Sequence, residues 1–244
     1  MVEEWMPPLQ LPLSSTQFVQ LPRNAAFRYT YHEGQAWIHP RPRYYHALLS
    51  LPGLAIDGPA RVSLRRFGPR DWAPLTELFA EAFADHQPFA GQEKPARCVA
   101  AREALERTAD GGDGPWIERA SFVAYDPAHG ILGAIMVTLL PALDPTHWDS
   151  YSWEDPPPAD CIERRLGRPH LTWIFVDPQR AGRGIGCALL RASATALIAM
   201  GYDELASTFM LGNESSMLWH WRAGFRLLSY PGSRRKERGG SAEC

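Results

Sequence analysis

Hydrophobic positions divide the second half of the chain into alternating strands and helices. Leu171 to Val176 is an unbroken run of apolar and β-branched residues, which is typical of a strand buried on both faces. An Ala-rich stretch follows, and its apolar residues recur at helical spacing on one face: Ile185, Ala188, Leu189, Ala192 and Ala196. Residues 204 to 210 are a further candidate strand. The pattern predicts strand, loop, helix and strand in that order.

Upstream, the pattern continues in the same way. Residues 61 to 67 alternate as a strand, and Asp71 is a favourable N-cap for a helix with these residues on one face: Leu75, Leu78, Phe79, Ala82 and Phe83. A second helix is expected over residues 95 to 108. Residues 121 to 125 and 131 to 140 predict two longer strands joined as a hairpin.

The N-terminal quarter has a different texture. Residues 1 to 24 are rich in Pro, Leu and Gln and are expected to form an irregular arm, whereas residues 26 to 51 indicate three strands. Turn residues at 52–53 and 57–59 mark a boundary. We therefore expect an arm and β-rich extension over 1–58, a main domain over 59–232 and a polar, disordered tail over 233–244.

Composition narrows the class of protein. The chain has 244 residues, 45% of them apolar, and a net charge of −2, which gives no support for nucleic acid or an anionic membrane as a partner. No apolar run approaches the ~20 residues of a membrane span, and the N-terminus does not resemble a signal peptide. The four cysteines form no C-x-x-C pair, so neither a zinc site nor a disulfide framework is expected and a reducing cytoplasm is the plain inference.

A metal site is not expected at the N-terminal histidines either. His32, His39 and His46 are spaced by seven, which would put successive ones on opposite faces of a continuous strand. A prolyl break also separates them.

A glycine-rich loop carries the clearest chemical signal. Gly182, Gly184 and Gly186 lie between the strand ending at Val176 and the Ala-rich helix. This arrangement directs free backbone N–H groups, and the positive end of the helix dipole, at one anion. The loop lacks the Lys-Ser/Thr of a nucleotide triphosphatase, and Cys187 stands where a dinucleotide fingerprint needs glycine.

Two motifs resemble the GNAT superfamily of N-acyltransferases. The first is Val-x-Pro-x-x-x-Gly-Arg-Gly-Ile-Gly-x-x-Leu-Leu, from Val176 to Leu190, which resembles the loop that binds the coenzyme A pyrophosphate. The second runs from Asn213 to Phe225 and resembles the family's Asn-x-x-Ala/Ser-x-x-φ-Tyr-x-Lys/Arg-x-Gly-Phe signature. Gly224 is the residue expected just past a helix C-terminus. The resemblance covers about residues 60 to 230.

The resemblance implies a mixed α/β fold, with a mostly antiparallel central sheet flanked by helices. It implies that acetyl-CoA is held by a strand that splays from its neighbour, by the glycine loop and by the asparagine of the second motif: Ile174, Phe175, Val176, Ala181, Gly182, Arg183, Gly184, Ile185, Gly186, Cys187 and Asn213. Ala181 departs from the Gln or Arg that commonly opens the loop. Family members also close the sheet with a further strand. Here we expect that strand to be missing, or supplied by the N-terminal β segment or a second subunit.

The catalytic residues depart from the family pattern. The tyrosine acid falls on His220, which either protonates the leaving thiolate or only packs beside it. The glutamate base of some members aligns with Thr208, which cannot serve. The remaining candidates for the base are His170, and Glu163 or Asp160 acting through water.

Candidate acceptor contacts come from two segments. In the family the first helix and the loop after it line the acceptor pocket, so Phe83, Asp85, His86 and Phe89 are candidates, with Phe83 also explained as core. The 29 residues from Pro141 to Pro169 stand where the family has a short turn, and they carry Trp148, Tyr151 and Trp153 among carboxylates. This insertion either encloses a cationic amine or packs against the N-terminal segment or a second subunit.

The sequence thus predicts an acetyltransferase that moves the acetyl group of acetyl-CoA to a primary amine, by direct attack and without a metal. The acceptor is a small-molecule or peptide amine, and a homodimer stays open. The alternatives are a non-catalytic coenzyme A-binding or scaffolding protein, and an acyltransferase that uses a longer acyl-CoA.

Overall fold

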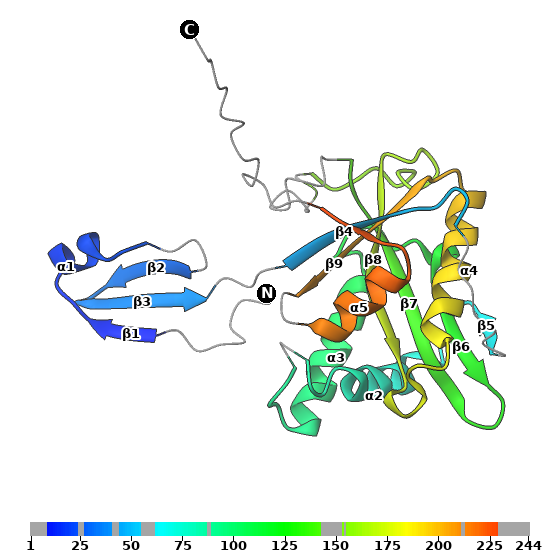
Figure 1. Ribbon diagram of the computed structural model, residues 1–244, viewed down its shortest axis with the longest axis horizontal. Helices are drawn as coiled ribbons and strands as arrows, with labels where there is room; N and C mark the ends of the chain where they lie inside the picture. Colours follow the sequence, from blue (N-terminus) through cyan, green and yellow to red (C-terminus); the bar gives the residue numbers. More distant parts are fainter. Residues whose placement is uncertain are drawn as a thin grey trace, which may run out of the picture.

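The computed structural model describes residues 9–23, 27–40, 44–54, 62–86, 89–142, 153, 155–210 and 213–228 (Figure 1). Its elements in chain order are β1 (Leu9–Pro12), α1 (Ser15–Gln20), β2 (Phe27–His32), β3 (Gln35–Pro40), β4 (Tyr44–Ser50), β5 (Ser63–Arg65), α2 (Trp72–Ala82), α3 (Lys94–Ala109), η1 (Glu118–Ala120), β6 (Phe122–Asp126), β7 (Gly130–Pro141), β8 (Gly167–Val176), η2 (Pro178–Arg180), α4 (Ile185–Ala199), β9 (Glu204–Met210), α5 (Glu214–Arg222) and β10 (Arg226–Leu227). No helix in these ranges is long and apolar enough to cross a membrane.

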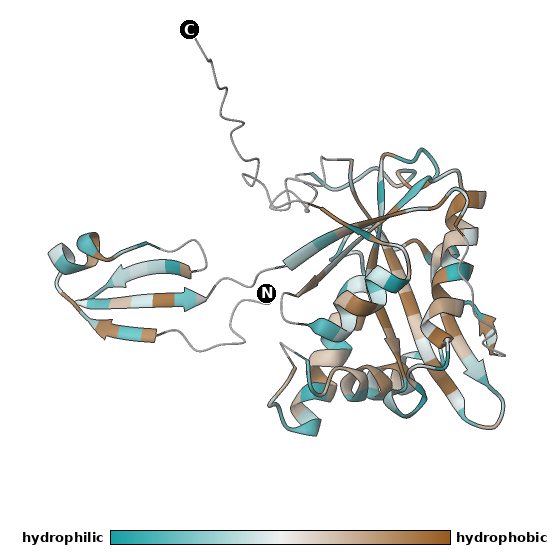
Figure 2. Ribbon diagram, in the orientation of Figure 1, coloured by the Kyte–Doolittle hydropathy of each residue, from teal (hydrophilic) through white to brown (hydrophobic). Residues whose placement is uncertain are grey.

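A seven-stranded sheet organises the main body of the molecule. Its strand order is β10-β4-β9-β8-β7-β6-β5, and every neighbouring pair is antiparallel except β8 and β9. Strand β7 is buried along most of its length, and Figure 2 shows its apolar colouring in the middle of the sheet. This is the mixed, mostly antiparallel sheet that the sequence predicts.

Helices cover both faces of the sheet. Buried residues of α4 form one hydrophobic cluster with the sheet, and side chains of α5 pack against the same cluster. Helices α2 and α3 supply the second cluster, on the other face. Alternating residues of β7 divide between the two clusters, with Ile135 and Val137 in the first and Ala134 and Met136 in the second. The sheet is therefore the middle of three layers.

The N-terminal segment supplies an inner strand of this sheet. Strand β4 lies between β9 and β10 and pairs with β9 along its whole length, from Tyr44 opposite Met210 to Ser50 opposite Glu204. Its buried residues include Ala47, Leu48 and Leu49. One alternative expected from the sequence, a closing strand supplied by the N-terminal β segment, is confirmed. The domain boundary at residue 58 thus does not coincide with the edge of this sheet.

The remaining N-terminal strands form a separate sheet in the order β1-β3-β2, which Figure 1 shows apart from the main body. The expectation of an irregular arm over residues 1 to 24 is wrong within residues 9 to 23, where β1 and α1 occur. Ser14 and Gln17 cap α1 reciprocally, each side chain bonding the other's backbone N–H.

Most of the predicted boundaries agree with the structure to within two residues, but the role of Asp71 differs. Asp71 stands at the N-cap of α2, and its side chain makes no capping hydrogen bond to the helix. Its carboxylate instead accepts from both terminal nitrogens of Arg65, at 2.6 and 2.7 Å, and from the Gly68 N–H. These bonds fix the entry to α2 and hold the pKa of Asp71 below its usual value.

Candidate functional site

The glycine loop begins directly after β8 and leads into α4. Gly182 and Gly184 have φ of 78° and 80°, a region that residues with a side chain rarely adopt. Ala188 is the first residue of the helix whose N–H bonds back to the loop, at 2.9 Å from the Gly184 carbonyl. The N–H groups before it are those that a helix cannot satisfy internally. Such a helix N-terminus favours an anion, because its free N–H groups and the helix dipole both attract negative charge.

The third glycine has a packing role. A Cβ at Gly186 would lie 3.1 Å from Nε1 of Trp219. Helices α4 and α5 therefore approach closely at this point because residue 186 has no side chain. Trp219 is a partly buried residue beside the loop for which the resemblance implies coenzyme binding.

Strands β8 and β9 separate beside this loop. Only two residue pairs join them, His170 with Ala206 and Leu171 with Ser207, although β8 continues to Val176. The other edge of β9 pairs with β4 along its whole length. The backbone of β8 from 172 to 176 is thus unpaired on its β9 side, within the described residues, while its other side pairs with β7. The two strands bound a wedge that opens towards the glycine loop.

A bulge in β8 shapes the wedge. The pairing with β7 shifts between Met136 and Val137, so that Thr172 is an extra residue in β8. As a result Leu171 belongs to the cluster under α4, while Trp173 belongs to the cluster under α2 and α3. A regular strand would put both on the same face.

Polar side chains meet at the narrow end of the wedge. His170 Nε2 lies 3.1 Å from the Thr208 hydroxyl, and His170 Nδ1 lies 3.2 Å from the Thr172 hydroxyl. Burial, the charge of Arg168, and the neighbouring His46 and His220 lower the pKa of His170 to about 3. His170 is therefore a neutral imidazole at physiological pH.

His220 comes from α5 and lies on the face of the sheet that α4 covers, against Ser207 and Phe209 of β9. Its Nδ1 donates to the Ser216 carbonyl at 2.7 Å, and its Nε2 lies 2.8 Å from the hydroxyl of Ser207, the strand neighbour of Thr208. The ring stacks on Phe209 and is 3% exposed. Burial lowers its pKa to about 4, against a smaller upward effect of the Ser216 bond. His220 is thus neutral at pH 7, with both nitrogens in hydrogen bonds.

Comparisons with known proteins point to one fold. No family model matches the sequence. The mycothiol acetyltransferases of Clavibacter michiganensis subsp. michiganensis (strain NCPPB 382) and Clavibacter sepedonicus are each 27% identical over 168 residues, covering 69% of this chain and 44% of theirs. The chain thus spans less than half the length of these curated relatives. A GCN5-related N-acetyltransferase from Sphaerobacter thermophilus superposes with a TM-score of 0.50 at 15% identity, covering 91% of this chain and 57% of that one. The chain has the GNAT fold.

The two segments that resemble GNAT motifs lie side by side in the structure. Asn213 caps α5, accepting at Oδ1 from the Ser216 N–H at 3.0 Å and the Ser215 hydroxyl at 2.9 Å. Gly224 follows the helix with φ of 90°, as expected. Ala181 is exposed at the start of the glycine loop, and Cys187 is half-buried in the first turn of α4.

An aromatic wall borders the wedge on the α2 side. Phe83 lies 4.5 Å from Phe79 and 5.9 Å from Trp173, measured between ring centroids. The Trp173 indole N–H donates to Thr108 at 2.8 Å, which fixes the ring. Phe83 is half-buried, so the structure is compatible with both of its expected roles, core and acceptor contact.

The loop after α2 contacts the start of α5. His86 Nε2 lies 3.1 Å from the Ser215 hydroxyl, and Asp85 beside it is exposed. This contact joins two segments 129 positions apart in the chain. His86 therefore connects the layer of α2 and α3 with the second GNAT motif.

Of the aromatic residues of the insertion, only Trp153 is described; Trp148 and Tyr151 lie outside the described residues. The Trp153 indole N–H donates to the Leu139 carbonyl at 2.9 Å, and its ring packs against the core cluster under α4. This placement agrees with packing as the role of Trp153. It leaves the acceptor role of the insertion a prediction.

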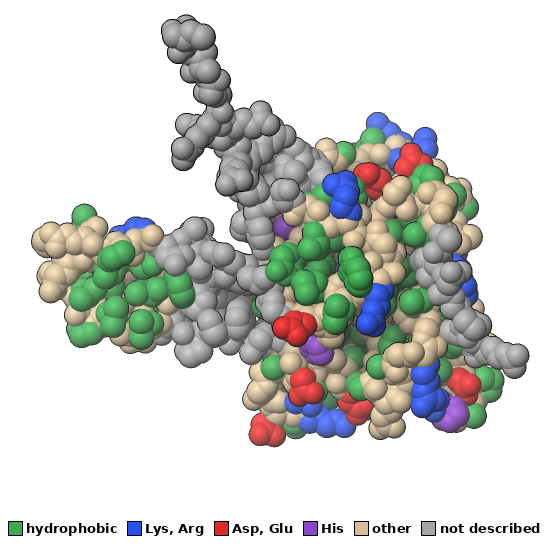
Figure 3. All heavy atoms as spheres, viewed as in Figure 1, with side chains coloured by type: hydrophobic (Ala, Val, Ile, Leu, Met, Phe, Trp, Pro, Cys, Tyr) green, Lys and Arg blue, Asp and Glu red, His purple; other side chains and the backbone are tan. Residues whose placement is uncertain are grey.

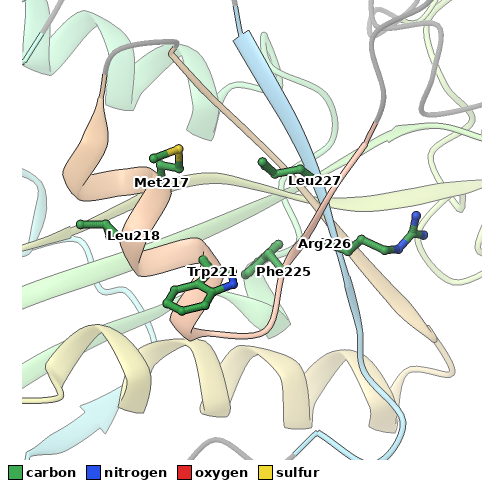
Figure 4. A pocket seen from close by; sticks show the side chains of 6 residues that line it. All are labelled: Met217, Leu218, Trp221, Phe225, Arg226 and Leu227. Atoms are coloured by element: carbon green, nitrogen blue, oxygen red, sulfur yellow. The ribbon is translucent and has the colours of Figure 1, made fainter. Parts of the chain in front are cut away.

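A separate groove lies on the outer surface of α5. It is lined by Met217, Leu218, Trp221, Phe225, Arg226 and Leu227 (Figure 4). Trp221 is 73% exposed, and Figure 3 shows apolar side chains gathered on this part of the surface. Arg226 is the one lining residue with a polar side-chain group other than the indole, so the groove has no acid or base for acyl transfer.

Sequence reasoning missed several polar residues in and around the wedge. Thr208 was set aside as unable to replace a glutamate, while Thr138, Thr172, Ser207 and His46 were not linked to the site. Their signal is non-local, because it depends on which strands become neighbours. Among the described residues no three His, Cys, Asp or Glu side chains come together as metal ligands.

Proposed function

We propose that this protein transfers the acetyl group of acetyl-CoA to a primary amine. The observation that carries the proposal is the wedge between β8 and β9, which opens beside an anion-binding helix N-terminus. An unpaired strand edge offers N–H and C=O groups to the amide groups of a pantetheine arm. The loop at the wide end of the wedge offers N–H groups to a diphosphate.

The loop residues fit a diphosphate. Gly182, Gly184 and Arg183 present backbone and one cationic side chain, and a Cβ at Gly182 would meet no atom within 4 Å. The nearest carboxylate along the sequence, Asp177, is engaged by Arg180 at 3.5 Å and by the Gln179 N–H. These contacts would reduce its repulsion of a diphosphate. Ile174, Phe175 and Val176 would run beside the pantetheine arm.

The chemistry requires a neutral amine. An ammonium with a pKa near 10 costs roughly 4 kcal/mol to deprotonate at pH 7. Arg168 and the low-dielectric surroundings of His170, which lower the pKa of that histidine, would also disfavour an ammonium at the narrow end of the wedge. We propose that His170 takes up the amine proton as the bond to the thioester carbon forms, because bond formation makes this proton more acidic.

The acid role of His220 stays a proposal with an added constraint. A neutral His220 whose Nδ1–H is held by Ser216 has no second proton to give. It could reach the wedge only through Ser207, since its Nε2 faces that hydroxyl. His220 would then act by polarising Ser207.

Two measurements on the purified chain test the function. Calorimetry with coenzyme A should show saturable binding, and acetyl-CoA with an amine panel should release free thiol. The panel should include polyamines, aminoglycosides, peptide N-termini and, given the relatives named mycothiol acetyltransferases, mycothiol-related amines. Absence of coenzyme A binding by well-folded protein would refute the proposal.

A non-catalytic coenzyme A-binding protein is the rival function. The low pKa values of His170 and His220 favour it, because such a His170 is a weak base and a neutral His220 has no proton to donate to the thiolate. Binding without transfer to any member of the panel would support the rival. A longer acyl donor is distinguished by comparing acetyl-, butyryl- and octanoyl-CoA at one acceptor concentration.

A further inference from the structure

A line of hydroxyl and imidazole groups crosses four strands of the sheet. It starts at His46 on β4, whose Nδ1 lies 3.3 Å from the Thr208 hydroxyl on β9. Thr208 lies 3.1 Å from His170 Nε2 on β8. On the other side of the ring, His170 Nδ1 lies 3.2 Å from Thr172, whose hydroxyl is 2.8 Å from that of Thr138 on β7. We refer to these five residues as the hydroxyl–imidazole chain.

The hydroxyl–imidazole chain depends on the position of β4 between β9 and β10. Thr208 and His46 are directly opposite each other in the β4–β9 ladder, so their side chains share a face of the sheet. A strand formed by any other segment would not bring this imidazole to Thr208. His46 is 7% exposed, so its place is set by the core.

Counting the hydrogens leaves two possible sets of hydrogen-bond directions in the hydroxyl–imidazole chain. The Thr208 hydroxyl has one hydrogen and two imidazole nitrogens beside it, so it donates to one ring and accepts from the other. If it donates to His170 Nε2, then His46 carries its proton on Nδ1 and His170 carries its proton on Nδ1, towards Thr172. The other arrangement reverses every bond. The tautomers of the two histidines are therefore coupled through Thr208.

Both rings are neutral, which the counting requires. Burial and the charge of Arg168 lower the pKa of His46 to about 4, and the same two effects, together with His46 and His220, lower that of His170 to about 3. Arg168 comes from β8 and His220 from α5. Each ring thus has one N–H, and the charge of Arg168 opposes a permanent imidazolium at either position.

The hydroxyl–imidazole chain reaches the wedge at Thr208 and His170. Thr208 follows Ser207, the last residue of β9 that pairs with β8. Thr208 and His170 are partly exposed, whereas Thr138 and His46 are buried. Both nitrogens of His170 face threonine hydroxyls, and Thr172 is also partly exposed. When Nδ1 carries the hydrogen, only Nε2 can accept a proton, and Thr208 is the hydroxyl that faces Nε2. A hydroxyl that donates one bond and accepts one has a lone pair left for an amine N–H.

We propose that Thr208 relays the acceptor amine's proton to His170, and that His46 is the positioning residue that keeps Thr208 donating to His170. The inference rests on the proposed acetyl transfer. As the amine nitrogen bonds to the thioester carbon, its N–H bond breaks and the proton passes to the Thr208 oxygen. The Thr208 O–H bond breaks in the same step, and its proton passes to His170 Nε2.

The second half of the reaction returns this proton. The tetrahedral intermediate collapses to the amide, the carbon–sulfur bond breaks, and the thiolate leaves with the electron pair. The His170 imidazolium gives its proton back to Thr208, and Thr208 gives its own to the sulfur. The products are an N-acetyl amine and a free thiol, and the chain ends in its starting arrangement.

The first test determines the tautomers of His170 and His46 and does not require acetyltransferase activity. In full-length protein labelled with ¹⁵N-histidine, long-range ¹H–¹⁵N correlation should show His170 and His46 as neutral Nδ1–H forms. Phenylalanine at position 46 removes the donor to Thr208, so His46→Phe should leave His170 as a mixture of tautomers. Wild-type protein with His170 in the Nε2–H form would overturn the proposal, whether or not an acceptor amine is known.

The second test reads turnover. Thr208→Val should lower kcat by about 100-fold or more, the usual contribution of a positioned proton carrier, while Thr208→Ser retains most of it. His46→Phe should lower kcat by about tenfold, and His46→Asn, which keeps an N–H near the Nδ1 position, should restore it. The affinity for coenzyme A should change by less than about twofold in all four variants, which also verifies that they fold.

A matched control is Thr195→Val on α4. Thr195 is exposed, its hydroxyl donates to the Arg191 carbonyl at 2.8 Å, and it lies outside the wedge. It should behave as wild type. Thr208→Val turning over within threefold of wild type would contradict the proposal. So would a failure of His46→Asn to exceed His46→Phe. Wild-type protein that binds coenzyme A but acetylates no amine would refute the proposed function instead. The tautomer measurement would still show which way the hydrogen bonds of the hydroxyl–imidazole chain run.

Discussion

The glycine loop gives the sharpest test of coenzyme A binding, because the chain contains its own control. Gly182 in the loop and Gly130 in the β6–β7 turn have φ of 78° and 75°, and a Cβ at either would meet no atom within 4 Å. Alanine at either position therefore imposes the same backbone strain, about 1–2 kcal/mol, without a steric clash. The two positions differ in that only Gly182 borders the proposed diphosphate.

Gly182→Ala should weaken coenzyme A binding by about 5- to 30-fold, since 1.4 kcal/mol corresponds to tenfold in affinity. If the loop turns to relieve the strain, its N–H groups move away from the diphosphate. If the loop keeps its shape, the methyl group stands where the diphosphate approaches. Gly130→Ala should leave binding unchanged and lower the melting temperature by about 2–4 °C per kcal/mol of strain.

The assays are calorimetric titration with coenzyme A and thermal unfolding of both variants beside wild type. Equal coenzyme A affinity in Gly182→Ala, Gly130→Ala and wild type would refute the assignment of the loop. Weakened binding in both variants would point to a general loss of structure and would also count against it.

Three further predictions address other parts of the molecule. His220→Phe should lower kcat far more than it changes coenzyme A affinity, and unchanged turnover would remove His220 from the mechanism. Asp71→Asn should lower the free energy of unfolding at pH 7. The ion pair with Arg65 lowers the folded-state pKa of Asp71, so its contribution is present above the unfolded-state value of about 3.9 and is lost as pH falls through the folded-state value. The gap from wild type in urea unfolding should therefore close on acidification, and a constant gap down to pH 3 would contradict this. A truncated protein that begins at residue 41 should fold and bind coenzyme A. One that begins at residue 51 should be insoluble, because β9 and β10 lose the strand that both pair with. Equal solubility of the two would show that β4 is dispensable.

Local sequence signals predicted the parts of the fold that local interactions determine. The glycine loop, the helix after it and the strand over 204 to 210 were predicted with their order and approximate ends, since periodicity and glycine placement act within a few residues. Helix α1 was missed although Ser14 and Gln17 carry a capping-box signal, because the surrounding prolines and short length suggested an arm.

The hydroxyl–imidazole chain could not be found in the same way. Its members come from β4, β7, β8 and β9, and nothing local to His46 indicates that it will face Thr208. The bulge at Thr172 is equally hidden, because it follows from the register with β7. The sequence could offer three strand candidates near the N-terminus, but the choice of the third as a neighbour of β9 depends on tertiary packing.

The place of β4 also governs the order in which the molecule can assemble. Strand β4 ends at Ser50, whereas its neighbours β9 and β10 begin at Glu204 and Arg226, so a ribosome makes β4 long before either of them. Until then a largely apolar segment has exposed edges, a state prone to pairing with other chains. Closing so long a loop slows folding, so the nascent chain should depend on holding chaperones more than a protein whose last strand follows its neighbour directly.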